Sequence, residues 1–479
     1  MILAQLPLAD FVSFVSANWQ FCLLHFLEFA IWGAWYVVLG NLLNSRGFTR
    51  QEIGRIYATM PIGSMVSMLV IGPLVDKYLP AELVLGVSHL LGAALLMLMA
   101  RADNPRPFYW FAFLYALAYS PTLNLVNAVV FAQGGDVADN FPWVRVWGTI
   151  GWIVAGLSHA LLIRKGEPVN ERPLLLAAVL SLVLGVFAFS LPPAPEVQPV
   201  ADAGQAVATE TGAAQAVVDL LTQHPVFFLV TFVAAMAMGL YFAFAALFIE
   251  KRGVPSKVVG PVMTIGQWIE IFFMFSLTWF LGDKNANMNW VLLTGILAWS
   301  IRFGLFAIGN PIPLVLVGIA IHGICFDFFF AAGMMNANDI APVGLTATAQ
   351  SLYGFLVYGL GMYLGSEGAG WLNQKFSHIE SGRDGVHEVV TDWKRFWGIP
   401  CIIVSVSAAL FALSIFLTGN PTTNVTPSQQ TTTEQSADGS STTADGDSNS
   451  IDSGTDGGNA PDNSSTWHKV NRRPELQVV

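Results

Sequence analysis

The chain has 479 residues, of which 54% are hydrophobic and only 11% are charged, and its mean hydropathy is +0.56. Soluble globular proteins carry about 25% charged residues on a hydrated surface, so this composition excludes soluble enzymes and secreted disulfide scaffolds and indicates a membrane protein. The balance of 22 basic against 32 acidic residues, a net charge of −10, gives no sign of a nucleic-acid partner.

Apolar windows bounded by glycine, proline, asparagine or charged residues predict twelve membrane helices. In chain order they span residues 18 to 43, 53 to 75, 81 to 100, 107 to 132, 143 to 164, 173 to 191, 225 to 250, 257 to 281, 289 to 308, 311 to 336, 343 to 372 and 394 to 418. The sequence therefore predicts an all-α membrane protein in which six helices precede a polar interruption and six follow it.

The composition between and after these windows predicts the domain organisation. We expect two six-helix bundles, residues 1 to 191 and 225 to 418, joined by a flexible Pro- and Ala-rich linker over 192 to 224. Residues 419 to 479 are rich in Ser, Thr, Asp and Gly and hold few large apolar side chains, which predicts a disordered tail.

Among the charged residues within these windows, five stand in strongly apolar stretches, where an ionised group is costly unless it is paired or hydrated. They are Glu28, Arg145, Glu270, Arg302 and Asp327. Glu28 and Arg302 are compatible with a structural ion pair as well as with a functional role. For Glu270 and Asp327, deep in the second half, we favour a functional role.

Polar and aromatic residues fall at helical spacing on three of the windows. Arg145, Thr149 and Trp152 stand at i, i+4 and i+7, so they share one helix face. Gln267 and Glu270 stand at i and i+3, and the tenth window adds His322, Phe326 and Asp327. Around a cavity these residues would offer donors, acceptors and stacking rings to a polar solute that contains a ring.

The lone acids and the lone arginine in opposite halves also predict proton coupling. Solute binding can change the charge of a carboxyl group in an apolar cavity, and a nearby arginine favours its ionised form. We expect Asp327 or Glu270 to exchange protons, with Arg145 as counter-ion in the empty state and Glu28 as a third candidate. No nucleophile and base motif and no metal-ligand spacing appears, so we expect no enzyme activity, metal or cofactor.

Six segments carry a family resemblance. They are FLEFAIWGAWYVVLG (26 to 40), IGPLVDKYL (71 to 79), AYSPTLNLVN (118 to 127), FPWVRVWGTIGW (141 to 152), WSIRFGLFAIGNP (299 to 311) and HGICFDFFF (322 to 330). Over residues 20 to 418 the chain resembles the nucleoside:proton symporter family of the major facilitator superfamily. The resemblance implies twelve helices, alternating access and proton-driven nucleoside import by a monomer in the cell inner membrane, whose partners are the solute, protons and lipid.

The resemblance also implies site residues and shows departures. It assigns substrate binding to Arg145, Thr149, Trp152, Gln267, Glu270, His322, Phe326 and Asp327. Trp152 replaces a usual phenylalanine and His322 a usual tyrosine, while the seventh helix lacks an expected glutamine and asparagine, with Gly239 and Phe242 nearest those positions. Such a wall would accept a less hydroxylated solute.

Two alternatives to nucleoside import stay open from the sequence. The first is a symporter of a sugar or another polar metabolite, which the departures on the seventh helix favour. The second is a membrane sensor that binds a solute without transporting it, although the sequence shows no soluble output domain.

The loop charges conflict with the orientation that the resemblance implies. The family places both termini in the cytoplasm, which puts the odd-numbered loops outside. Most basic loop residues lie in those odd-numbered loops, and the positive-inside rule by itself predicts the opposite orientation. We follow the family and expect cytoplasmic termini.

Overall fold

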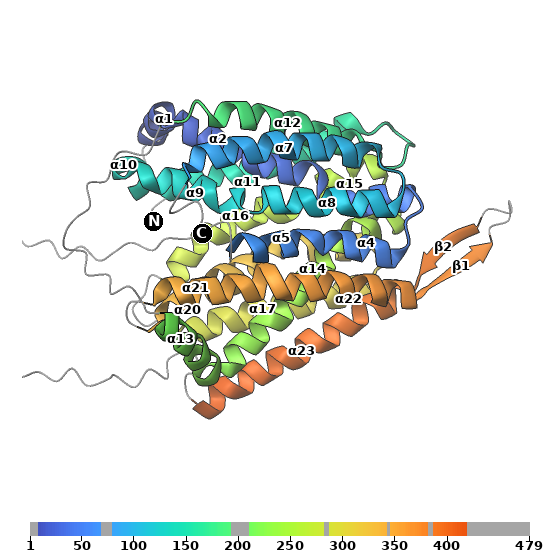
Figure 1. Ribbon diagram of the computed structural model, residues 1–479. Helices are drawn as coiled ribbons and strands as arrows, with labels where there is room; N and C mark the ends of the chain where they lie inside the picture. The colour runs from blue at the N-terminus through green and yellow to red at the C-terminus, as the bar shows by residue number, and fades with distance from the viewer. Residues whose placement is uncertain are drawn as a thin grey trace, which may run out of the picture. The chain divides into compact units, whose positions relative to one another are not determined.

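The computed structural model describes residues 8 to 68, 79 to 192, 210 to 281, 287 to 342, 345 to 381 and 387 to 418, and helices dominate it (Figure 1). In the first half these are α1 (Leu8–Ala17), α2 (Trp19–Trp35), α3 (Leu39–Ser45), α4 (Arg50–Tyr57), α5 (Thr59–Val66), α7 (Ala81–Arg101), α8 (Pro105–Tyr119), α9 (Thr122–Gln133), α10 (Gly135–Asp139), α11 (Phe141–Leu162) and α12 (Arg172–Ala188). The predicted tail and the GPLVDK segment (72 to 77) lie outside the described residues.

The second half of the chain is also mainly helical. Its elements are α13 (Glu210–Gln223), α14 (Pro225–Lys251), α15 (Ser256–Met263), α16 (Ile265–Leu281), α17 (Met288–Ile308), α18 (Ile312–Ala320), α19 (His322–Cys325), the π-helix η2 (Phe326–Ala331), α20 (Ala332–Asp339), α21 (Thr346–Gly354), the π-helix η3 (Phe355–Gly361), α22 (Met362–Lys375), β1 (Ser377–Ser381), β2 (His387–Thr391) and α23 (Trp393–Thr418).

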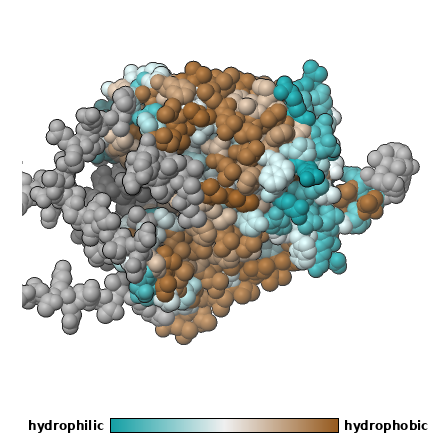
Figure 2. Space-filling model, viewed as in Figure 1, coloured by the Kyte–Doolittle hydropathy of each residue, from teal (hydrophilic) through white to brown (hydrophobic). Residues whose placement is uncertain are grey.

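Apolar length marks several of these helices as membrane spans. Within the described residues six helices are long and apolar enough to cross a bilayer, and the pair Ile312–Ala320 and His322–Asp339, bent by 42°, makes a seventh. Figure 2 shows hydrophobic side chains over the middle of the visible face and hydrophilic ones gathered at the end that carries β1 and β2. The prediction of a helical membrane protein agrees with this surface, and the count of twelve stays a prediction.

Several predicted windows are divided into shorter helices. The window 107 to 132 divides into α8 and α9 at Ser120 and Pro121, and the window 257 to 281 divides at Thr264, three residues after Pro261. Proline has no N–H to donate, which weakens the helix around it. At the second break the hydroxyl of Thr264 donates to the carbonyl oxygen of Pro261 at 2.7 Å.

Two elements differ from the sequence-based expectation. The second part of the predicted linker is the helix α13, where Ala216 and Leu220 are buried and Gln215 donates a hydrogen bond to Asp219. The prediction of a linker over 192 to 224 did not include this helix, whose alanine, valine and leucine residues have apolar surface to bury.

The second unexpected element is the antiparallel hairpin β1–β2 between α22 and α23, in which Ser377 pairs with Thr391. Glu388 of β2 pairs with Lys251 at the end of α14. The hydrogen bond and the positive charge from Lys251 lower the pKa of the Glu388 carboxyl below its ordinary value. The hairpin is therefore tied to a helix of the same half of the chain.

Packing within each half brings together helices that are distant in sequence. In the first half α2 packs along α11 and α12, and in the second half α14 packs along α22 and α23. The two halves meet where α4 lies on α22, α11 on α15 and α5 on η3. Of these elements, α5, α11, η3 and α22 contribute lining residues to the cavity described next.

Candidate solute-binding site

A cavity of about 210 Å³ lies between helices of the two halves. Its lining residues are Phe29, Trp32, Tyr36, Met60, Pro61, Ser64, Met68, Ser120, Leu123, Asn124, Asn127, Arg145, Thr149, Trp152, Met238, Phe242, Gln267, Glu270, His322, Phe326, Tyr358 and Met362. The first half supplies most of the polar side chains and the second half supplies Gln267, Glu270 and His322. The position and mixed chemistry of this cavity make it the candidate binding site.

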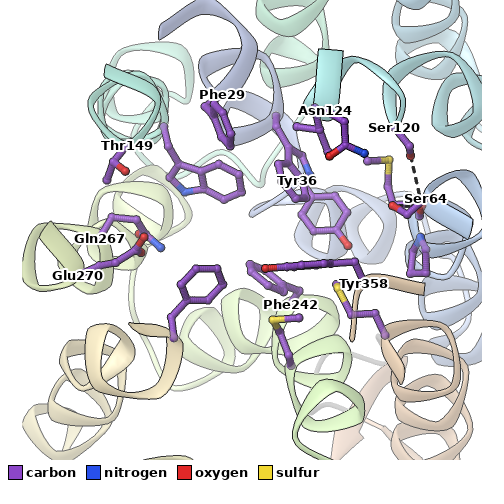
Figure 3. A pocket seen from close by; sticks show the side chains of 18 of the residues that line it. Phe29, Tyr36, Ser64, Ser120, Asn124, Thr149, Phe242, Gln267, Glu270 and Tyr358 are labelled. Carbon is purple, nitrogen blue, oxygen red and sulfur yellow. Dashed lines mark hydrogen bonds between the residues drawn. The ribbon is translucent and has the colours of Figure 1, made fainter. Parts of the chain in front are cut away.

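Seven of the eight residues proposed for substrate binding line this cavity. Thr149 projects from α11, and Gln267 and Glu270 project from α16 across the same space (Figure 3). Asp327 is absent from the lining. It is buried in η2, and its Oδ2 has no hydrogen-bond partner among the described residues.

The charged groups of the cavity have close neighbours of complementary character. The guanidinium of Arg145 lies over the ring of Phe29, 4.3 Å from the centroid, where the negative face of the ring attracts a cation. Nε2 of His322 lies 3.7 Å from Oε2 of Glu270. The cavity thus presents a cation on the first half and a carboxyl group beside an imidazole on the second half.

Both π-helical segments bring a residue to this site. Phe326 begins η2, next to Asp327, and Tyr358 lies in the middle of η3. A π-helix turns each side chain away from the direction that an α-helix would give it, and such segments occur often at functional sites. The sequence windows gave no sign of these changes in helical turn.

Glu28 lies outside the cavity lining, in a buried polar cluster of the first half. Its Oε2 is 2.8 Å from Nε2 of His89, and its Oε1 accepts a hydrogen bond from the hydroxyl of Thr122 at 2.7 Å. The hydroxyl of Tyr119 donates to the backbone oxygen of Glu28 at 2.8 Å. The carboxyl group therefore joins α2 to α7 and α9, and the backbone oxygen of the same residue joins α2 to α8.

Arg302 is fully buried in the second half. Its guanidinium carbon lies 4.1 Å from the ring centroid of Tyr241 and 5.0 Å from that of Trp299, and its Nε donates to the oxygen of Gly318 at 2.8 Å. Glu28 and Arg302, for which the sequence allowed a structural ion pair, therefore have other partners. Glu28 contacts His89 and Thr122, and Arg302 contacts Tyr241 and Gly318.

The structure adds lining residues that the sequence reasoning missed. Ser120, Asn124 and Asn127 follow one another at i, i+4 and i+7, a polar spacing in an otherwise apolar window that could have revealed them. Tyr36 and Tyr358 gave no such signal, because aromatic residues are common throughout membrane helices.

The structure shows what the missing glutamine and asparagine of the seventh predicted helix, α14, mean for the cavity wall. Phe242 and Met238 of α14 line the cavity with apolar surface. Gly239 packs against α22, where a Cβ atom would come within 2.6 Å of the backbone oxygen of Met362. The wall formed by α14 therefore lacks polar side chains, and position 239 has no room for one.

Comparison with known proteins decides the family. The family model described as nucleoside H+ symporter matches residues 15 to 419. The chain belongs to the nucleoside H+ symporter family. The Escherichia coli (strain K12) protein YegT is 33% identical over 81% of this chain and 91% of its own length. The xanthosine permease of the same organism is 29% identical over 82% of this chain and 93% of its own length.

A solved relative shows the same fold. The crystal structure of the nucleoside transporter NupG matches with a TM-score of 0.71 and 26% identity, over 83% of this chain and 98% of that one. The nucleoside H+ symporter family and its fold, expected from the sequence, are thereby confirmed. This member of the family is a multi-pass membrane protein whose relatives are transporters, which also confirms the prediction that it is not an enzyme.

Proposed function

We propose that this chain imports nucleosides together with protons, by alternating access to the cavity between two six-helix bundles. The observation that carries the proposal is the joint lining of one cavity by Arg145, Thr149 and Trp152 of α11 with Gln267 and Glu270 of α16. Family membership supports the substrate class, since the nucleoside transporter NupG and the xanthosine permease are relatives over most of the chain.

In this proposal a nucleobase stacks on aromatic rings of the two halves. Trp152 and Phe326 both line the cavity and offer planar surfaces from α11 and η2. Arg145, Gln267 and Glu270 then have donors and acceptors for the polar edge of the base. Stacking fixes the plane of the base and hydrogen bonds fix its rotation, which is the division of roles common in pockets for small ligands.

Proton coupling in this proposal uses the second half. Glu270 faces the cavity beside His322, and Asp327 is buried in η2, an element that packs against α16. A proton taken up with the solute neutralises a carboxyl group that would be costly to carry ionised through the membrane. Arg145, in the same cavity, compensates the carboxyl group when the solute is absent.

We also propose a monomer in the cell inner membrane with both termini in the cytoplasm. Under this orientation the end with α4 and the hairpin β1–β2 faces outward. The inherited topology of the family supports the orientation, against the distribution of basic loop residues.

Uptake by reconstituted vesicles tests the proposed function. Purified protein in proteoliposomes is expected to accumulate labelled uridine or adenosine, and a pH gradient that is acidic outside is expected to increase the accumulation. A pH difference of one unit is equivalent to about 1.4 kcal/mol, or about tenfold accumulation for one proton per solute. Empty vesicles and a dissipated gradient are the controls.

The same uptake assay tests the alternative functions. A panel of sugars and other polar metabolites tests the second transporter candidate. Accumulation of a sugar, with neither nucleoside uptake nor competition by nucleosides, would overturn the proposed substrate and leave the fold and family unchanged. Saturable binding without accumulation of any solute would favour a sensor.

A further inference from the structure

Tyr36 is a cavity residue whose hydroxyl group has no assigned task. It follows α2 as its C-cap, its side chain is fully buried, and it lines the cavity. Its hydroxyl has no hydrogen-bond partner among the described residues. Buried hydroxyl groups nearly always have a partner, so one that borders a binding cavity without a partner indicates a ligand atom.

The position of Tyr36 is held firmly by its neighbours. The hydroxyl of Tyr57 donates to the backbone oxygen of Tyr36 at 2.8 Å and accepts from the backbone N–H of Gly40 at 2.9 Å. The rings of Tyr36 and Tyr57 meet edge to face with centroids 5.0 Å apart. The Tyr36 hydroxyl is therefore placed before any solute arrives, which lowers the entropy cost of binding.

A row of rings connects Tyr36 to the proposed stacking surface for the base. Trp152 contacts Trp32 with centroids 5.2 Å apart, and Trp32 contacts Tyr36 at 5.6 Å. In Figure 3 Tyr36 lies between the side that carries Thr149 and the side that carries Asn124. Tyr36 and Trp152 thus line neighbouring parts of one cavity, connected through Trp32.

Tyr36 also contacts the apolar wall formed by α14, the seventh predicted membrane helix. The ring of Tyr36 contacts that of Phe242 with centroids 5.7 Å apart, and Phe242 stands close to where the resemblance implies an amide side chain. The hydroxyl of Tyr36 and Nε1 of Trp32 are therefore the polar atoms that α2 brings to the cavity, and Tyr36 is the residue that contacts Phe242 of α14, which offers only hydrocarbon.

We infer that Tyr36 donates a hydrogen bond to a pentose hydroxyl of the bound nucleoside and replaces, from the first half, the polar contact that α14 lacks. The inference rests on the proposed function and makes Tyr36 a determinant of specificity for ribonucleosides over nucleosides without ring hydroxyls. A site built to bind a hydroxyl group discriminates against the analogue that lacks it.

The variant Tyr36→Phe tests the inference, because it removes the hydroxyl and keeps the ring. Uptake of uridine and of 2′,3′-dideoxyuridine is measured in proteoliposomes for the unmodified chain and the variant. We expect KM for uridine to rise about two- to tenfold, the loss of one net hydrogen bond, and KM for 2′,3′-dideoxyuridine to stay unchanged. Tyr115→Phe, a buried tyrosine outside the lining, is the matched control and should alter neither value.

The outcomes separate this inference from the proposed function. If the unmodified chain takes up no nucleoside, the proposed function fails. If it takes up uridine and Tyr36→Phe alters both substrates equally or neither, the proposed function stands and the inference is overturned. Phe242→Gln in the Tyr36→Phe background gives a second readout, because an amide restored on α14 should recover the preference for uridine.

Discussion

At the scale of single residues, the structure sorts the buried charges by their surroundings. Arg145 and Glu270 line the cavity, whereas Glu28 is held by His89 and Thr122 outside it. A carboxyl group couples protons to transport only if solute binding changes its environment. The surroundings therefore favour Glu270 as the coupling group, and Asp327, which is buried but does not line the cavity, is the second candidate.

Neutral variants of the three acids test this assignment. We expect Glu270→Gln or Asp327→Asn to abolish the stimulation of uptake by a pH gradient, because an amide cannot exchange a proton. Glu28→Gln, a matched change, should keep the stimulation, because an amide can still hydrogen-bond to His89 and Thr122. Uptake driven by protons in both Glu270→Gln and Asp327→Asn would contradict the assignment, as would its loss in Glu28→Gln alone.

At the scale of elements, helix α4 of the first half lies against α22 of the second half with almost no space between their backbones. A Cβ atom on Gly54 would come within 2.5 Å of the oxygen of Ser366 and 2.6 Å of the Cα of Gly370. These are backbone atoms that cannot rotate aside. Alternating access requires such a contact to open and close, so glycine at position 54 permits the closed arrangement.

A larger side chain at this contact is expected to block transport. Gly54→Leu should reduce the rate of nucleoside uptake at least about tenfold. A tenfold change in rate corresponds to about 1.4 kcal/mol, and we expect the steric cost of closing this contact around a leucine side chain to be larger than that. Gly368→Leu, on the partner helix α22, is the control, since nothing lies within 4 Å of a Cβ at that position. Equal uptake by the two variants, at equal amounts of folded protein, would show that this contact does not gate transport.

The helices illustrate which features a sequence reveals. The apolar windows predicted where the helices run, because burial in lipid requires long apolar stretches. They did not reveal the π-helices at Phe326 and Tyr358, or the hairpin after α22, because these depend on contacts between distant segments. For the same reason Tyr36 and Tyr358 emerged as lining residues only in the folded chain.

At the scale of the whole molecule, the open question is which end faces the cytoplasm. Figure 1 shows α4 and the hairpin β1–β2 at the end opposite to α10. Basic loop residues favour the first end as cytoplasmic, whereas the proposed orientation, which follows the topology that the family resemblance implies, places this end outside. Members of one family share the orientation of all their helices, so we give the family topology precedence over the loop charges.

Cysteine labelling decides the orientation. Native Cys22 and Cys325 are buried and Cys401 is half-buried, so background labelling is low. A membrane-impermeant reagent added outside intact cells is expected to label Gln51→Cys, on an exposed position of α4, and to spare Asp139→Cys on α10. The reverse pattern would establish the orientation that the positive-inside rule predicts.

The sequence by itself determined the membrane class and the family, and it predicted seven of the residues that line the cavity. A low charged fraction makes each buried exception visible, and helical spacing places Arg145, Thr149 and Trp152 on one face. Only the tertiary structure decided that Glu28 pairs with His89, that Asp327 stands behind the cavity wall, and that Tyr36 faces Phe242. These relations join helices far apart in the chain, and packing rather than local sequence sets which side chains meet there.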